Sequence, residues 1–113
     1  MQLDRIRGRE LDQLFQAILN LKTMDDCYRF FDDLCTVNEV KALAVRLEVA
    51  RMIKEGYTYQ QIEQQTGAST ATISRVKRCL YYGTQGLKQA LDHISQNTGQ
   101  DSPQDQDDPM SSS

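Results

Sequence analysis

The sequence has little of what a metalloprotein or an enzyme needs. It contains three cysteines and one histidine in 113 residues. Cys27, Cys35 and Cys79 are widely spaced and form no C-x-x-C pair, so reduced thiols are expected and a structural zinc site is not. His93 has no serine, cysteine or aspartate partner at a spacing that suggests catalysis. We therefore predict no catalytic residues, no cofactor and no metal.

Long apolar runs are also missing. No run approaches the 18 residues that a membrane-spanning helix requires, and the first residues do not resemble a signal peptide. The sequence therefore predicts neither membrane insertion nor secretion, and a cytoplasmic location.

Positive charge is scarce, and it is unevenly distributed. The formal net charge is −3. Residues 98–113 carry four aspartates and no base, whereas eight basic residues face five acidic ones between Val37 and Asn97. This balance predicts modest non-specific affinity for nucleic acid. From Asn97 onward Met110 is the only apolar residue, so 97–113 is predicted to be a disordered acidic tail.

Apolar residues recur at helical spacing through the first third of the chain. After a polar segment, residues 1–8, which is expected to be a mobile arm, a helix is predicted over 9–21 with Leu11, Leu14, Phe15, Ile18 and Leu19 on one side. Thr23 is expected to cap a second helix with Cys27, Tyr28, Phe30, Phe31 and Leu34 on its apolar side. These side chains suit a core or a dimer interface better than a cofactor site.

A third helix is predicted from Thr36, which forms a capping-box sequence with Glu39, to Gly56. Apolar residues occupy more than one of its faces, so it has to be covered on more than one side. An interleaved dimer can do this more easily than a small monomer. Thr84 is expected to cap a last helix with an apolar stripe of Leu87, Ala90, Leu91 and Ile94.

The most specific pattern lies in residues 58–82. Thr58 and Gln61 form a capping box, Ile62 is the expected buried residue, and Gly67 ends the helix in the left-handed conformation that glycine adopts at no steric cost. Ser69 is then expected to cap a second short helix. Few folds other than the helix-turn-helix require this spacing.

The second helix of this motif has two distinct sides. Ile73, Val76 and Leu80 form the inward stripe, and at 100° per residue the opposite side carries Ala71, Arg75 and Arg78. Small and hydroxylic residues followed by arginines are suited to the major groove of DNA. The candidate DNA-binding residues are Gln60, Gln61, Ser69, Thr70, Ala71, Thr72, Ser74, Arg75, Lys77 and Arg78.

Two segments also resemble a known family. L-C-T-V-N-E-V-K-A-L-A-V-R-L-E-V-A-R-M-I-K-E-G and the later G-A-S-T-A-T-I-S-R are similar to the Trp repressor superfamily, with the nearer likeness to its YerC/YecD-type group of Trp-repressor-like proteins. The resemblance covers roughly residues 13–94. It implies an all-α, six-helix, intertwined homodimer whose DNA-binding domain spans 9–96, and two recognition helices that read a palindromic site in double-stranded DNA.

The resemblance also assigns roles to particular positions. Thr70, Ala71, Thr72 and Ser74 match the base-contacting positions of the family. Glu63 is acidic where the repressor itself carries a base, which puts the repressor's operator specificity in doubt here.

The resemblance further implies a candidate effector pocket, made of Thr36, Arg46, Arg75, Val76 and Cys79. In the family, two arginines flank bound tryptophan, and Arg46 and Arg75 match them. Val76 stands where the family has a glycine that leaves room for the indole, and Cys79 replaces a serine that holds the amino group. An isopropyl group in the indole slot overlaps the ring, so no response to tryptophan is expected.

Two classes of function remain after these arguments. The first is a homodimeric, sequence-specific DNA-binding transcriptional regulator that represses its targets. The alternative is a helical protein-interaction module that keeps the fold without reading DNA, which the low basicity and Glu63 favour.

Overall fold

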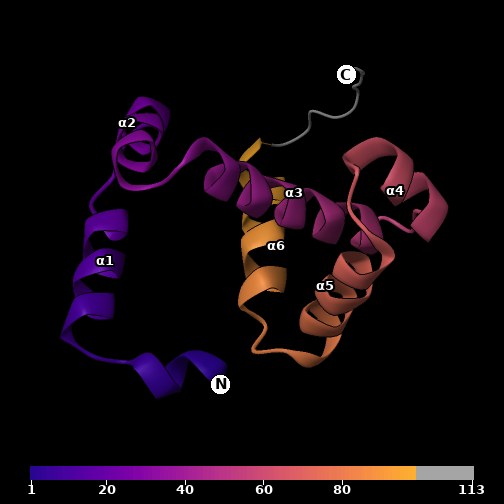
Figure 1. Ribbon diagram of the computed structural model, residues 1–113, viewed down its shortest axis with the longest axis horizontal. Coiled ribbons are helices and arrows are strands. Elements are labelled where there is room, and N and C mark those ends of the chain that lie inside the picture. The colour runs from indigo at the N-terminus through magenta and orange to yellow at the C-terminus, as the bar shows by residue number, and fades with distance from the viewer. Residues whose placement is uncertain (99–113) are drawn as a thin grey trace. The chain divides into compact units, whose positions relative to one another are not determined.

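The computed structural model describes residues 1–98, and these form a short 3-10 helix and six α-helices without a strand (Figure 1). The 3-10 helix spans Gln2–Ile6, and the α-helices are α1 (Arg9–Leu19), α2 (Met24–Leu34), α3 (Val37–Lys54), α4 (Tyr59–Thr66), α5 (Thr70–Tyr82) and α6 (Gly86–Thr98). The chain divides within α3 into two compact units, one ending at Val45 and one beginning at Arg46. None of the described helices is both long and apolar enough to cross a membrane. The prediction of six helices and no strand is confirmed for these residues.

The predicted caps form where the sequence placed them in the first half of the chain. The hydroxyl of Thr23 accepts a hydrogen bond from the backbone N–H of Asp26 at 3.0 Å, and the Asp26 carboxylate accepts one from Thr23 N–H at 3.2 Å. Thr36 and Glu39 exchange the same pair of bonds at 2.8 and 3.1 Å. The backbone N–H of Lys22 lowers the pKa of Asp26, with further help from Thr23 and Arg29. These bonds satisfy backbone donors that the helix itself leaves unpaired.

The first unit buries almost nothing by itself. No residue before Val49 is buried, although α1 and α2 are strongly amphipathic. Phe30 and Phe31 stack edge to face at 5.2 Å, yet Leu19 remains 76%, Tyr28 72% and Val37 78% exposed. Exposed apolar surface on this scale marks an interaction site in a natural protein. The residues predicted for a core or a dimer interface are therefore at most half-buried within this chain.

The second unit contains the core. It is built from one face of α3 and the inward stripes of the helices that follow, namely Val49, Ala50, Met52, Ile53, Ile62, Ile73, Val76, Leu80 and Leu91. Figure 1 shows α5 and α6 side by side and joined by a short loop, and α4 and α6 both contact α5. An ion pair between Lys54 and Asp92 links the end of α3 to α6. Burial of these aliphatic side chains provides most of the stability of this unit.

Several boundaries differ from the predictions, and the first helix, predicted to reach residue 21, ends at Leu19. Thr84 does not cap α6, because the helix begins two residues later at Gly86 and Gln85 intervenes with a left-handed φ of 77°. The Thr84 hydroxyl instead accepts a hydrogen bond from Gly86 N–H within the loop. Within residues 1–8, for which a mobile arm was predicted, Gln2–Ile6 forms a 3-10 helix, and the mobility of this segment stays a prediction. The helix α6 extends one residue past Asn97, and the remainder of the predicted acidic tail lies outside the described residues.

Candidate nucleic-acid interface

The local geometry of α4, the turn and α5 follows from a chain of side-chain caps. Thr58 and Gln61 form the predicted capping box at 2.9 and 3.1 Å. Gly67 adopts φ 75° and ψ 4°, so the left-handed residue that ends α4 is the predicted glycine. Ser69 then accepts a hydrogen bond from Thr72 N–H at 3.2 Å, which caps α5. The predicted helix-turn-helix geometry is present.

Thr66 contributes to the turn in a way that the sequence reasoning missed. Its hydroxyl donates to the Ile62 carbonyl at 2.7 Å and accepts from Ala68 N–H at 3.1 Å. One side chain thereby satisfies a carbonyl of α4 and an amide of the turn. The signal was a threonine directly before the helix-ending glycine, since threonine hydroxyls commonly bond to nearby backbone in this way.

The outward face of α5 is open to solvent. The predicted DNA-binding residues exposed on α5 include Thr70, Ala71, Ser74, Arg75 and Arg78, and Gln60 is exposed on α4. Within residues 1–98, neither Arg75 nor Arg78 takes part in an ion pair. Two guanidinium groups without an acidic partner are suited to bind phosphate or a guanine edge.

The other predicted contacts are engaged within the protein. Gln61 accepts the capping-box hydrogen bond from Thr58 N–H, and Ser69 is the N-cap of α5. Thr72 is half-buried, and its Oγ1 accepts a hydrogen bond from the Ser69 hydroxyl at 3.2 Å. Lys77 is exposed, but its ammonium lies 5.7 Å from the centre of the Tyr59 ring. These four residues shape the motif in addition to any contact that they make with a ligand.

The candidate effector residues do not all face solvent. Val76 is 6% exposed and belongs to the buried stripe of α5, whereas Arg46, Arg75 and Cys79 are exposed. Thr36, in the first unit, uses its hydroxyl in the capping box with Glu39. Among the described residues, no group of three His, Cys, Asp or Glu side chains is placed to hold a metal ion.

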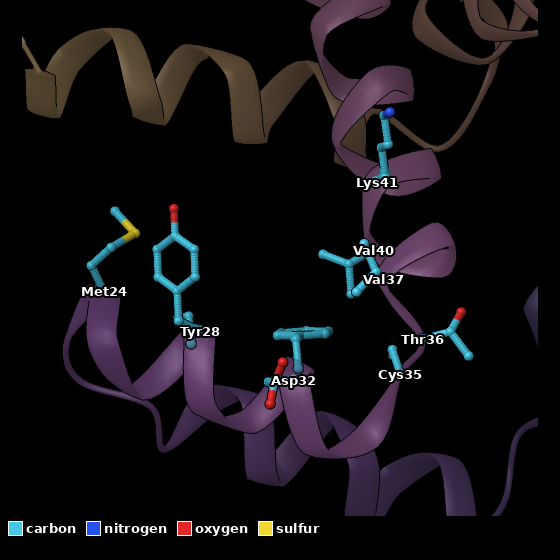
Figure 2. A pocket seen from close by; sticks show the side chains of 10 residues that line it. Met24, Tyr28, Asp32, Cys35, Thr36, Val37, Val40 and Lys41 are labelled. Atoms are coloured by element: carbon cyan, nitrogen blue, oxygen red, sulfur yellow. The ribbon is translucent and has the colours of Figure 1, made fainter.

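A second feature, in the first unit, was not found from the sequence. An apolar groove of about 580 Å³ lies between α2 and the start of α3. Figure 2 shows Met24 and Tyr28 of α2 and Val40 of α3 extending toward the same space, with Asp32 and Lys41 also on its lining. The signal was the apolar side of α2, but periodicity does not say whether such a side is covered by the same chain.

Comparisons with known proteins agree on one family. The sequence profile described as Trp repressor protein matches residues 9–95. The Bacillus subtilis protein YerC, named as uncharacterized, is 65% identical over 96 residues, which cover 85% of this chain and 92% of that protein.

Two solved structures show the same fold. A Staphylococcus aureus protein described as a candidate Trp repressor superposes with a TM-score of 0.81 at 58% identity, covering 84% of this chain and 95% of that one. A TrpR-like protein from Eubacterium eligens gives 0.78 at 48% identity, covering 81% and 95%. Because the profile spans most of the chain and the identities are high, this protein belongs to the Trp repressor family.

Proposed function

We propose that this protein is a homodimeric, sequence-specific DNA-binding transcriptional repressor that reads a palindromic site with α5 and does not respond to tryptophan. The observation that carries the proposal is the exposed outer face of α5, where Thr70, Ala71 and Ser74 precede two arginines that form no ion pair with any residue of 1–98. Small residues allow the first turn of the helix to approach base edges, while guanidinium groups bind phosphate or guanine.

The homodimer is supported by the first unit. No residue of the first unit is fully buried within the chain, and the unit exposes several large apolar side chains and an apolar groove. A second copy of the chain is the proposed partner, because family members are expected to form intertwined dimers. Two-fold symmetry would then place two copies of α5 about one turn of DNA apart, so the preferred site is a palindrome.

The absence of a tryptophan response is supported by Val76. This side chain lies in the core of the second unit at the position where the family resemblance requires a glycine. An indole ring would have to displace the isopropyl group together with the side chains packed around it. Arg46 and Arg75 remain exposed, so their proposed role is to contact the phosphate backbone.

The proposal is tested by electrophoretic mobility shift on genomic fragments, followed by selection of bound sequences from a random DNA pool. Affinity should fall steeply as salt increases, because released counterions contribute to binding. Arg78→Ala should weaken binding of the selected site by about tenfold or more, if the side chain reads a guanine, and relax the preference at one base pair. Lys22→Ala, which removes one charge from a loop in the first unit, is the matched control.

The opposite result would favour the protein-interaction alternative. The half of the chain that carries the motif has a charge excess of only +3, and the half-buried Glu63 adds an acid to α4. If no fragment shifts even at low salt, and Arg78→Ala behaves like Lys22→Ala, DNA is not the ligand and a protein partner becomes the better proposal.

A further inference from the structure

The two helices of the motif meet at a second place, away from the turn that joins them. The ammonium group of Lys77 lies 5.7 Å from the centre of the Tyr59 ring. Tyr59 is the first residue of α4 and is half-buried, whereas Lys77 is an exposed residue in the middle of α5. A cation within about 6 Å of an aromatic face is attracted by the negative charge density of the ring.

This contact lies at the open end of the angle between α4 and α5. Tyr59 is eight residues before Gly67 and Lys77 is ten residues after it, so each group is about 10 Å or more from the turn along its helix. The buried side chains Ile62 and Ile73 lie nearer to the turn. A contact far from the vertex restrains an angle more effectively than an equal contact near it.

The position of Lys77 around α5 sets it apart from the arginines. At 100° per residue, Lys77 is about 40° from the buried Ile73 and about 160° from Arg75. The sequence analysis predicted that Lys77 binds DNA together with the arginines. In the structure, however, the ammonium group of Lys77 is directed toward α4. Its charge is already engaged with an aromatic ring, while Arg75 and Arg78 have no acidic partner within residues 1–98.

We infer that Lys77 is a positioning residue, which together with Tyr59 sets the angle at which α5 is presented to DNA, and that it is not a phosphate contact. This inference rests on the proposed function. Base readout depends on side chains held within about 0.5 Å and 10–20° of their productive geometry. The Tyr59–Lys77 pair therefore acts on the placement of Thr70, Ala71 and Ser74 without touching the ligand.

The test is a double-mutant cycle measured on a selected DNA site at several salt concentrations. Lys77→Met removes the charge and keeps the stem, and Tyr59→Leu removes the ring and keeps an apolar side chain. Each is expected to weaken specific binding about two- to fivefold, in line with an exposed cation–π contact. The double variant should be no weaker than either single one, and the salt dependence should match the wild type. The conservative variants Lys77→Arg and Tyr59→Phe should bind normally, since both retain the interaction.

A different pattern would overturn the inference. If Lys77→Met lowers the salt dependence by about one counterion while Tyr59→Leu binds as the wild type does, Lys77 contacts phosphate. The Tyr59–Lys77 interaction is also measured without DNA. Urea unfolding of the wild type, the two single variants and the double variant gives the coupling free energy of the pair. The NMR signals of the Lys77 ε-protons should show a ring-current shift that Tyr59→Leu abolishes. If the wild type binds no DNA, the proposed function fails, and the unfolding coupling alone then decides whether the pair braces α4 against α5.

Discussion

Val76 matters both for the packing of α5 and for whether tryptophan can bind. Its side chain is buried in the same stripe as Ile73 and Leu80, so it stabilises the second unit whether or not a ligand exists. Calorimetric titration with L-tryptophan should give no heat of binding. Micromolar affinity would show that the isopropyl group does not block the slot.

The structural role of Val76 gives a second measurement on the same residue. Val76→Ala should lower the free energy of unfolding by about 2 kcal/mol, because it removes buried methyl groups and leaves a small cavity. Urea denaturation measures this change. A loss near zero would mean that the side chain is not packed as the structure has it.

Gly83 is required where the chain leaves α5. A Cβ at this position would lie 2.4 Å from the carbonyl oxygen of Cys79, which itself accepts the last hydrogen bond of the helix from Gly83 N–H. Gly83→Ala should therefore lower the free energy of unfolding by about 1–3 kcal/mol, since backbone has to move. Thermal denaturation measures it.

Gln85 lies two residues further on, and a substitution there is the control for Gly83→Ala, because it should not lower the melting temperature. It holds a left-handed φ of 77°, a conformation that costs a residue other than glycine about 1 kcal/mol or more. Gln85→Gly should leave the melting temperature unchanged or raise it. If Gly83→Ala also leaves it unchanged, the loop tolerates a shift that relieves the contact with Cys79.

At the scale of elements, an ion pair between Lys54 and Asp92 links α3 to α6. The hydrogen bond from Lys54, aided by the charges of Lys54 and Lys88, lowers the pKa of Asp92 below its ordinary value. A carboxyl whose pKa is lower in the folded than in the unfolded state stabilises the fold above the unfolded pKa. That stabilisation is lost as the pH falls from about 4 through the folded pKa.

Removing the Asp92 carboxylate should therefore reduce the loss of folding stability at acidic pH. Asp92→Asn is expected to be less stable than the wild type at pH 7, and the difference should shrink as the pH falls from about 4 through the folded pKa of Asp92. Urea denaturation across this range measures the difference. Because both partners are substantially exposed, the effect should be small and should shrink in high salt. A difference that does not shrink as the pH falls below about 4 would mean that the substitution acts through packing.

At the scale of the whole molecule, the exposed apolar surface of the first unit is the basis for the proposed dimer. Its exposed apolar residues need a partner, and Val37 lies on the groove at 78% exposure. In a monomer, Val37→Asp would be neutral or slightly stabilising, because an acid in the first turn of a helix is favoured. In the proposed dimer the same change buries a charge and should dissociate the subunits.

Sedimentation velocity distinguishes these cases, supported by the concentration dependence of the melting temperature. The wild type should sediment as a dimer, and Val37→Asp should shift toward monomer with a lower melting temperature. Asn38→Asp, which places the same charge on the next residue of α3 outside the groove lining, should behave as the wild type does. A monomeric wild type would contradict the proposal.

Local signals in the sequence were sufficient for the motif and for most helix boundaries. Thr23, Thr36, Thr58 and Ser69 cap helices as predicted, and Gly67 takes the left-handed conformation, because each depends on bonds within a few residues. The start of α6 was missed because the path of the Gly83–Gly86 loop depends on how α6 packs against α5 rather than on the nearest capping residue.

The sequence by itself determined the helices, the helix-turn-helix and the inward stripe of α5, since periodicity and capping are local properties of the chain. Only the tertiary structure decided which apolar faces are covered by the same chain and which are left exposed. It likewise decided that Lys77 faces Tyr59, a residue 18 positions away. Burial and contacts between helices depend on how elements pack, and no periodicity within a single helix contains that information.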